Sequence, residues 1–291
     1  MNNNKNISDQ ENTEHIDFFK KVEVPFTKSK EDIWDALSKK IEKEDSVQPK
    51  GKLISMVWYK VAAAAVIILI GSTSFMKLYT TTVFSEQGNH TSHILPDGSS
   101  VELNAASTIS YQPYWWSINR AVSLEGEAFF EVKKGSKFIV MSTYGNTEVL
   151  GTSFNIYARN HEYKAFCKTG KVRVSNNTST VELVITPSEM AILDLKNNTG
   201  RIENGLVENI ISWRLNEFCF EATPLAKVIE EIEIQYNVSI TLEAGNLDSL
   251  LYSGRFTKKV TADVTLELIC QSFNLNFTAK EKNNYNISMN N

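Results

Sequence analysis

Hydrophobic and polar positions follow three different patterns along the chain, and each is typical of a different kind of structure. An early segment carries apolar residues at helical spacing, whereas the later segment VAAAAVIILIGSTSFM is apolar and uncharged throughout. After that segment, apolar and polar residues mainly alternate. The sequence therefore predicts a short helical head, one long apolar helix and a large β-rich part, in that order.

The early helix is predicted from Lys30 to Glu44, after about a dozen N-terminal residues whose lack of apolar periodicity predicts disorder. Ser29 can cap this helix, and two acidic residues fall in its first turn. Too few residues surround its narrow apolar stripe to form a core, so we expect the stripe to bind a protein partner. The alternative is a marginal helix that only holds the chain. The stripe consists of Ile33, Trp34, Leu37 and Ile41.

The long apolar helix has the features of a membrane span. Over residues 57–79, with its lysines snorkelling, it would reach about 34 Å, which is enough to cross a bilayer. A buried soluble helix is disfavoured because this helix is apolar all round. Nearly sixty residues precede it, so we expect an anchor that is retained and not a cleaved signal peptide. The aromatic residues at its ends are Trp58, Tyr59 and Tyr79.

Basic residues are distributed unequally around this helix. After Lys77 there is no lysine or arginine until Arg120, whereas lysines are frequent before the helix. The positive-inside rule therefore predicts a cytoplasmic N-terminus, with a C-terminus that is periplasmic in a Gram-negative bacterium or lumenal in a eukaryote. The lysines on the N-terminal side are Lys39, Lys40, Lys43, Lys50, Lys52 and Lys60.

The alternating pattern beyond the apolar helix predicts an all-β domain over residues 80–205, built as a sandwich or a short solenoid. Pro96-Asp97-Gly98 predicts a tight turn. Residues 212–291 follow the order β-α-β-β-α-β-β, which predicts a small α+β domain with two helices on one face of a sheet. The alternating pairs of the β domain are Val101/Leu103, Val122/Leu124, Phe138/Val140, Val172/Val174 and Leu183/Ile185.

Composition and motifs give no indication of an enzyme. The net charge of −4 disfavours direct nucleic-acid binding, and no phosphate-binding, dinucleotide-binding or hydrolase motif is present. Glu125, Glu127 and Glu131 could be paired acids, but without a histidine or metal cluster we expect a solvated strand edge. We therefore predict no catalytic residue, no metal and no cofactor.

Three further groups of residues have both a structural and a functional interpretation. His90, His93 and Asp97 could in principle hold a metal, but we expect a polar segment without one. The three cysteines are expected to be small buried hydrophobic residues, with a Cys219–Cys270 bridge as the alternative. An aromatic cluster could stack on a sugar or anchor a partner, although core packing is favoured. This cluster consists of Tyr111, Tyr114, Trp115 and Trp116.

Four motifs of the β-rich part resemble the FecR-like regulators of extracytoplasmic-function sigma factors. They occur in the family's order and approximate spacing, and the tail from Trp213 resembles the domain that follows FecR in Bacteroidetes members. That tail is similar to the secretin and TonB-receptor short N-terminal (STN) fold. The motifs are LPDGSSVELNAASTISY from Leu95 to Tyr111, RAVSLEGEAFFEV from Arg120 to Val132, VLGTSFNIYA from Val149 to Ala158, and TGKVRV from Thr169 to Val174.

The resemblance implies an anti-sigma factor in the bacterial inner membrane that relays a signal from a TonB-dependent, SusC-like receptor. The signalling domain of that receptor would bind outside, and a sigma factor would bind residues 1–56 inside, although this head is shorter than in better-known members. Gly71 to Ser74 would weaken the span for an intramembrane protease, or they pack against another helix. The alternative function is a membrane-anchored glycan- or protein-binding module without sigma-factor control.

Overall fold

The computed structural model of the chain describes residues 27–45, 56–243, 249–281 and 283–289. The first dozen residues, for which the sequence predicts disorder, lie outside these ranges, and so do Lys50 and Lys52. The chain divides into two units, Met1–Val66 and Ile67–Asn291, and the boundary falls inside a helix.

The first unit contains the predicted amphipathic helix, α2 (Lys30–Asp45). Ser29 caps it as expected, because the backbone N–H of Asp32 donates to the Ser29 hydroxyl at 3.2 Å and the Ser29 N–H donates back to the Asp32 carboxylate at 3.2 Å. Every side chain from residue 27 to residue 43 is exposed. The helix is therefore stabilised by its own capping and is not packed into a core.

The predicted apolar helix is α3 (Met56–Leu78), within one residue of its expected bounds. It is long and apolar enough to cross a membrane, and none of its side chains is buried. Near its C-terminal end the hydroxyl of Thr73 donates to the Leu69 carbonyl at 2.8 Å. This satisfies the hydroxyl within the helix, as an apolar environment requires.

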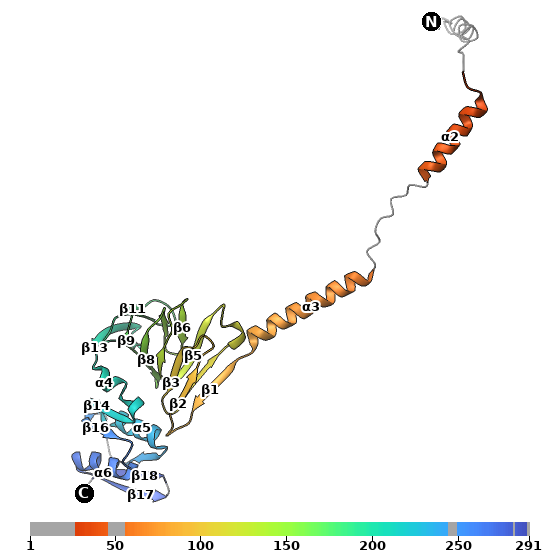
Figure 1. The fold of residues 1–291 in the computed structure, drawn as a ribbon. Coiled ribbons are helices and arrows are strands. Elements are labelled where there is room, and N and C mark those ends of the chain that lie inside the picture. The colour runs from red at the N-terminus through yellow and green to blue at the C-terminus, as the bar shows by residue number, and fades with distance from the viewer. Residues whose placement is uncertain (1–26, 46–55, 244–248, 282, 290–291) are drawn as a thin grey trace, which may run out of the picture. The chain divides into compact units, whose positions relative to one another are not determined.

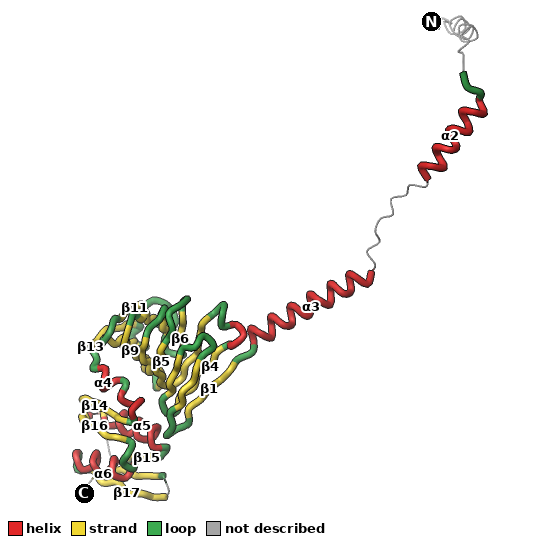
Figure 2. The backbone as a smooth tube through the Cα atoms, in the orientation of Figure 1, coloured by secondary structure: helices red, strands yellow, loops and turns green. Residues whose placement is uncertain are grey.

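Strands dominate the chain from residue 81 to residue 204, as Figure 2 shows in yellow. Each of the five alternating residue pairs predicted from the sequence lies on a strand. The strands are β1 (Thr81–Ser85), β2 (Thr91–Ile94), β3 (Ser100–Leu103), β4 (Ser107–Tyr111), β5 (Arg120–Glu131), β6 (Phe138–Met141), β7 (Asn146–Val149), β8 (Ser153–Arg159), β9 (Glu162–Thr169), β10 (Val172–Ser175), β11 (Glu182–Ile185), β12 (Glu189–Asp194) and β13 (Thr199–Asn204).

These strands form two sheets that enclose one core, and we call this part the sandwich (Figure 1). One sheet has the order β1-β4-β5-β6-β7-β10-β11 and the other has the order β2-β3-β5-β8-β9-β12-β13. The long strand β5 belongs to both sheets, because its first half pairs with β4 and β6 and its second half pairs with β3 and β8. Of the two architectures expected from the sequence, the structure has the sandwich.

Gly126 lies where β5 passes from one sheet to the other, and it allows the backbone to bend there. Its φ is +99°, and a Cβ there would lie 2.8 Å from the Ser107 Cα.

We predict that Gly126→Ala lowers the free energy of unfolding by at least about 2 kcal/mol, since it adds both backbone strain and overlap. Urea unfolding measures this, with Gly88→Ala as control because Gly88 also has positive φ, but a Cβ there would meet no atom closer than 3.5 Å. Equal losses for the two variants would contradict this role for Gly126.

The C-terminal domain follows the predicted order of strands and helices. Its core is one cluster to which the two longer helices and all five strands contribute. It comprises α4 (Val207–Ile210), η2 (Ser212–Leu215), β14 (Glu217–Pro224), α5 (Leu225–Tyr236), β15 (Ser239–Leu242), β16 (Leu251–Thr257), α6 (Ala262–Ser272), β17 (Leu275–Glu281) and β18 (Asn284–Met289).

The expectation of one small sheet in this domain is wrong. The strands β14 and β16 pair with each other, while β15, β18 and β17 form a separate sheet. The reason is that β15 pairs in parallel with the last strand of the chain, and periodicity reports which residues are apolar but not which strands pair.

Candidate functional site

The four residues predicted to bind a partner all lie on α2 and are exposed. Their exposed fractions are 42% for Ile33, 69% for Trp34, 46% for Leu37 and 54% for Ile41. The spacing of four residues from Ile33 to Leu37 to Ile41 places these three on one side of the helix. The structure therefore presents them as one apolar stripe, and their role in binding stays a prediction.

A second site, which the sequence did not predict, lies where the sandwich contacts the C-terminal domain. Its centre is the carboxyl group of Glu127, which directly follows the Gly126 bend in β5 and is buried. The Glu127 carboxylate accepts hydrogen bonds from the side-chain amides of Asn104 at 2.7 Å and Asn155 at 2.8 Å. Because each carboxylate oxygen accepts one N–H, both amide groups are held in a fixed orientation.

The two oriented amides turn their oxygen atoms toward the C-terminal domain. The Asn155 oxygen accepts the indole N–H of Trp213 at 3.3 Å, and the Asn104 oxygen accepts the side-chain N–H of Gln235 at 2.8 Å. Both donors are buried. Glu127 therefore positions two acceptors for donors from the other domain, although it forms neither hydrogen bond itself.

Phe129 and Arg214 add a second contact beside this network. The Arg214 guanidinium lies 3.9 Å from the centre of the Phe129 ring and donates to the Glu102 carboxylate at 2.8 Å. The hydrogen bond that Arg214 donates to Glu102 raises the pKa of Arg214. Phe129 belongs to the core cluster of the C-terminal domain although it lies on a strand of the sandwich, so the two domains share apolar packing as well as polar contacts.

Burial controls the ionisation of Glu127. Burial raises the pKa of this carboxyl most and the nearby charge of Glu231 adds to the rise, while Arg159 and the two asparagines oppose it, so the pKa is about 7. The side chain of Gln235 also contacts His90 at 3.3 Å, and burial lowers the pKa of that histidine. The contact region thus holds a carboxyl group that can change its charge near neutral pH.

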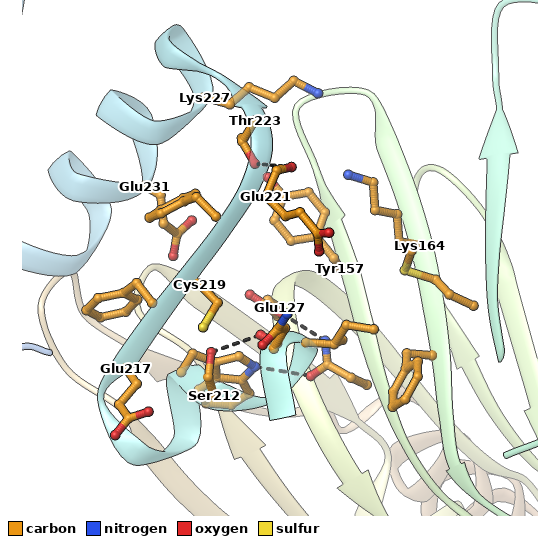
Figure 3. Close-up of a pocket in the computed structure, with 18 of the residues that line it drawn as sticks. Glu127, Tyr157, Lys164, Ser212, Glu217, Cys219, Glu221, Thr223, Lys227 and Glu231 are labelled. Atoms are coloured by element: carbon orange, nitrogen blue, oxygen red, sulfur yellow. Dashed lines mark hydrogen bonds between the residues drawn. The ribbon is translucent and has the colours of Figure 1, made fainter. Parts of the chain in front are cut away.

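A cleft of about 370 Å³ opens next to Glu127 (Figure 3). The sandwich contributes Tyr157 and Lys164 to its wall, and β14 contributes Cys219 and Glu221. Burial lowers the pKa of Lys164 and raises that of Tyr157. The lining combines aromatic rings with carboxyl groups and the amino group of Lys164.

The expectation of a solvated edge for the three glutamates is wrong for Glu127. Glu125 and Glu131 are exposed, but Glu127 is covered by the C-terminal domain. Alternation along β5 indicates which residues share a face, but it cannot show that a second domain packs on the polar face. The signal in the sequence was Phe129, an aromatic residue at a position that alternation assigns to the outside.

The residues considered for a metal site have separate structural partners. His93 contacts the Tyr111 hydroxyl at 2.8 Å, and Asp97 accepts the Arg120 Nε–H at 2.9 Å. Among the described residues no group of three or more histidine, cysteine or acidic side chains could hold a metal. The three cysteines are free, so the alternative Cys219–Cys270 bridge is not formed.

Comparisons with known proteins match both outer domains. The family model "FecR protein" matches residues 81–173, and the model "FecR, C-terminal" matches residues 217–287. No curated protein matches the sequence.

Two solved structures are similar to the chain, and both are crystal structures of a candidate anti-sigma factor from Parabacteroides distasonis. Each is 28% identical with a TM-score of 0.66, and the matches cover 73% and 72% of this chain and 100% of the other. The resemblance drawn from the four motifs is thereby confirmed, and the chain belongs to the FecR-like family of sigma-factor regulators.

Proposed function

We propose that this protein is a single-span anti-sigma regulator of the bacterial inner membrane, with a cytoplasmic head and a periplasmic sensor. The head would bind an extracytoplasmic-function sigma factor. The sandwich and the C-terminal domain would receive a signal from the signalling domain of a TonB-dependent, SusC-like receptor. The observation that carries the proposal is one exposed apolar stripe on α2, joined through an apolar helix to the two FecR domains.

The membrane placement is supported by the apolar surface of α3, none of whose side chains is buried. Outside a membrane this surface would be in contact with water. The lysine asymmetry around α3 supports the cytoplasmic placement of α2. Gly71 and the hydroxyl residues that follow it support cleavage by an intramembrane protease as one route of signalling, because they weaken the last turns of the helix.

The C-terminal domain supports the receptor side of the proposal. It has the β-α-β-β-α-β-β order predicted for the tail that resembles the STN fold. A shared fold does not by itself identify a ligand. The receptor side of the proposal rests on the family to which both outer domains are matched.

The head provides the direct test. We predict that Trp34→Ala or Leu37→Asp weakens sigma-factor binding at least about 30-fold, as expected when an aromatic or apolar anchor at the centre of an interface is lost. The measurement is co-purification of the sigma factor with the full-length, detergent-solubilised chain. Lys39→Ala is the matched control, because Lys39 is exposed on the opposite side of α2. Undiminished binding by both apolar variants would exclude the stripe as the interface.

The alternative function is a membrane-anchored glycan- or protein-binding module without sigma-factor control, and glycan binding through the aromatic cluster finds less support. Trp116 is buried against Tyr111 and Phe138, with ring centres 5.5 and 5.8 Å apart. It therefore cannot present a face to a sugar. The same co-purification separates the two functions, since a glycan-binding module has no reason to retain a sigma factor.

A further inference from the structure

The connection between α3 and the sandwich is very short. Helix α3 ends at Leu78 and β1 begins at Thr81, which leaves two residues between them. Two extended residues span roughly 7 Å. If α3 crosses the membrane, as the proposed function holds, the end of the sandwich where β1 begins must lie at the bilayer surface.

Strand register shows which segments share this end of the sandwich. Thr81 pairs with Tyr111, and Tyr111 pairs with Val122. In the same sheet Phe138 pairs with both Arg120 and Val149. The segments 112–119, 132–137 and 150–152 therefore lie beside the start of β1, and the turn that precedes β10 joins them because Arg173 pairs with Glu148. We call this group of segments the α3-proximal end.

The first of these segments is uncharged, presents exposed Tyr114 and Ile118, and contacts α3. Residues 112–119 contain no charged side chain, and Tyr114 and Ile118 are 53% and 68% exposed. The Tyr114 ring lies 5.3 Å from that of Tyr79 and 6.4 Å from that of Phe75. Phe75 belongs to the last turn of the apolar helix, so Tyr114 lies at the depth where interfacial aromatic residues are found.

The other segments are basic. Lys133, Lys134, Lys137 and Lys171 lie on them, and Lys137 forms an ion pair with Glu148. Among the described residues, the remaining three lysines form no ion pair. Asp97, in the turn that approaches Lys133 at Gly98, is already bound by Arg120. Every charged side chain on the segments of the α3-proximal end is therefore basic, and these segments carry an excess of positive charge.

Two of these lysines line a hollow of about 350 Å³. Lys134 and Lys171 are at its rim, together with the exposed side chain of Leu150 and two glycines. Thr152 also lines it, is 5% exposed, and has a hydroxyl without a hydrogen-bond partner among the described residues. Such a hollow suits an anionic oxygen-bearing group, because it offers two ammonium groups and small residues that allow close approach.

We propose that the α3-proximal end is a bilayer-docking surface that binds the phosphate groups of anionic phospholipids through Lys133, Lys134 and Lys171. Tyr114 and Ile118 enter the interface beside α3. Docking fixes the sandwich relative to the membrane. Force or movement applied to the C-terminal domain is then transmitted to α3 and is not lost in rotation about the two-residue connection.

The test uses the full-length chain in lipid nanodiscs made of phosphatidylcholine with phosphatidylglycerol. The photoreactive residue benzoyl-phenylalanine replaces Ile118, and separate variants carry it at Leu69 in α3 and at Leu268 on α6. Leu268 is the matched control because it is 51% exposed and because its domain is joined by hydrogen bonds to Gly88 and Asn104 at the opposite end of the sandwich. Covalent phospholipid adducts are measured by mass spectrometry after illumination.

We expect lipid adducts at positions 69 and 118 and none at 268. Changing Lys133, Lys134 and Lys171 to glutamine should lower the yield at 118 at least about threefold in anionic discs, since each lysine near such a surface favours contact about fivefold. Changing Lys196, Lys259 and Lys280, which are exposed elsewhere, should leave the yield unchanged.

Each other result has a distinct meaning. The docking surface would be overturned by equal adduct yields at positions 118 and 268, or by a yield at 118 that does not fall when the three lysines are changed. An adduct at position 69 in the same experiment would show that the membrane span still holds. Absence of an adduct at 69 would instead reject the membrane span, and with it the proposed function on which this inference rests.

Discussion

Trp213→Ala is expected to lower the free energy of unfolding of the outer domains by about 3–5 kcal/mol, the usual cost of removing a large buried aromatic side chain. Trp213 is 4% exposed, stacks edge-on against His90 at 5.2 Å and donates to Asn155. Since it contacts both domains, its loss should also separate them. Hydrogen exchange measures this separation as faster exchange of the amides around Glu127 and Phe129.

A pair of phenylalanine variants separates the hydrogen bond from the packing. Trp116 is buried to nearly the same degree, at 5%, but among the described residues its indole N–H has no partner. Trp213→Phe leaves the Asn155 oxygen buried without its donor and should cost about 1–3 kcal/mol more than Trp116→Phe. Urea unfolding of both variants checks this. A similar loss for the two would show that the Trp213 hydrogen bond contributes nothing to the contact.

Local features of the fold could be read from the sequence because short-range rules determine them. Ser29 caps α2 through its own neighbours, and α3 is recognisable from its composition alone. The strands around Val101 and Val172 likewise follow from a period of two, because half of each strand must face the core.

Features that depend on pairing across long separations could not be read in this way. Nothing in the motif around Gly126 states that β5 is shared by two sheets, and nothing near Val238 states that β15 pairs with the last strand. The buried hydrogen-bond network around Glu127 could not be predicted from the sequence for the same reason. Asn104, Asn155 and Gln235 are ordinary polar residues in sequence and become a contact only when three distant elements meet.

The burial of Glu127 predicts an unusual dependence of stability on pH. Below about pH 4.5, the ordinary pKa of this carboxyl, it is protonated in both the folded and the unfolded chain. Between about 4.5 and 7 the folded chain keeps a proton that the unfolded chain has released, so each rise in pH favours unfolding. The stabilisation present at low pH is thus lost as pH rises to about 7, by roughly 3 kcal/mol in total.

Glu127→Gln isolates this effect, because glutamine does not titrate. The hydroxyl oxygen of the protonated Glu127 carboxyl can still accept an N–H at pH 5, whereas the NH2 group of glutamine cannot, so the variant leaves one asparagine N–H without its acceptor and should be less stable than the original chain at pH 5. That deficit should shrink by roughly 3 kcal/mol at pH 8, where the original chain carries a buried charge. Glu125→Gln, an exposed carboxyl two residues earlier on the same strand, should show no comparable change between the two pH values. Urea unfolding of the three chains at both pH values gives the differences directly, and a deficit of Glu127→Gln that stays constant would mean that Glu127 does not titrate in this range.

Because the C-terminal domain takes part in burying Glu127, the same proton should strengthen the contact between the domains, and hydrogen exchange around Trp213 should therefore be slower at pH 5 than the intrinsic pH dependence alone predicts.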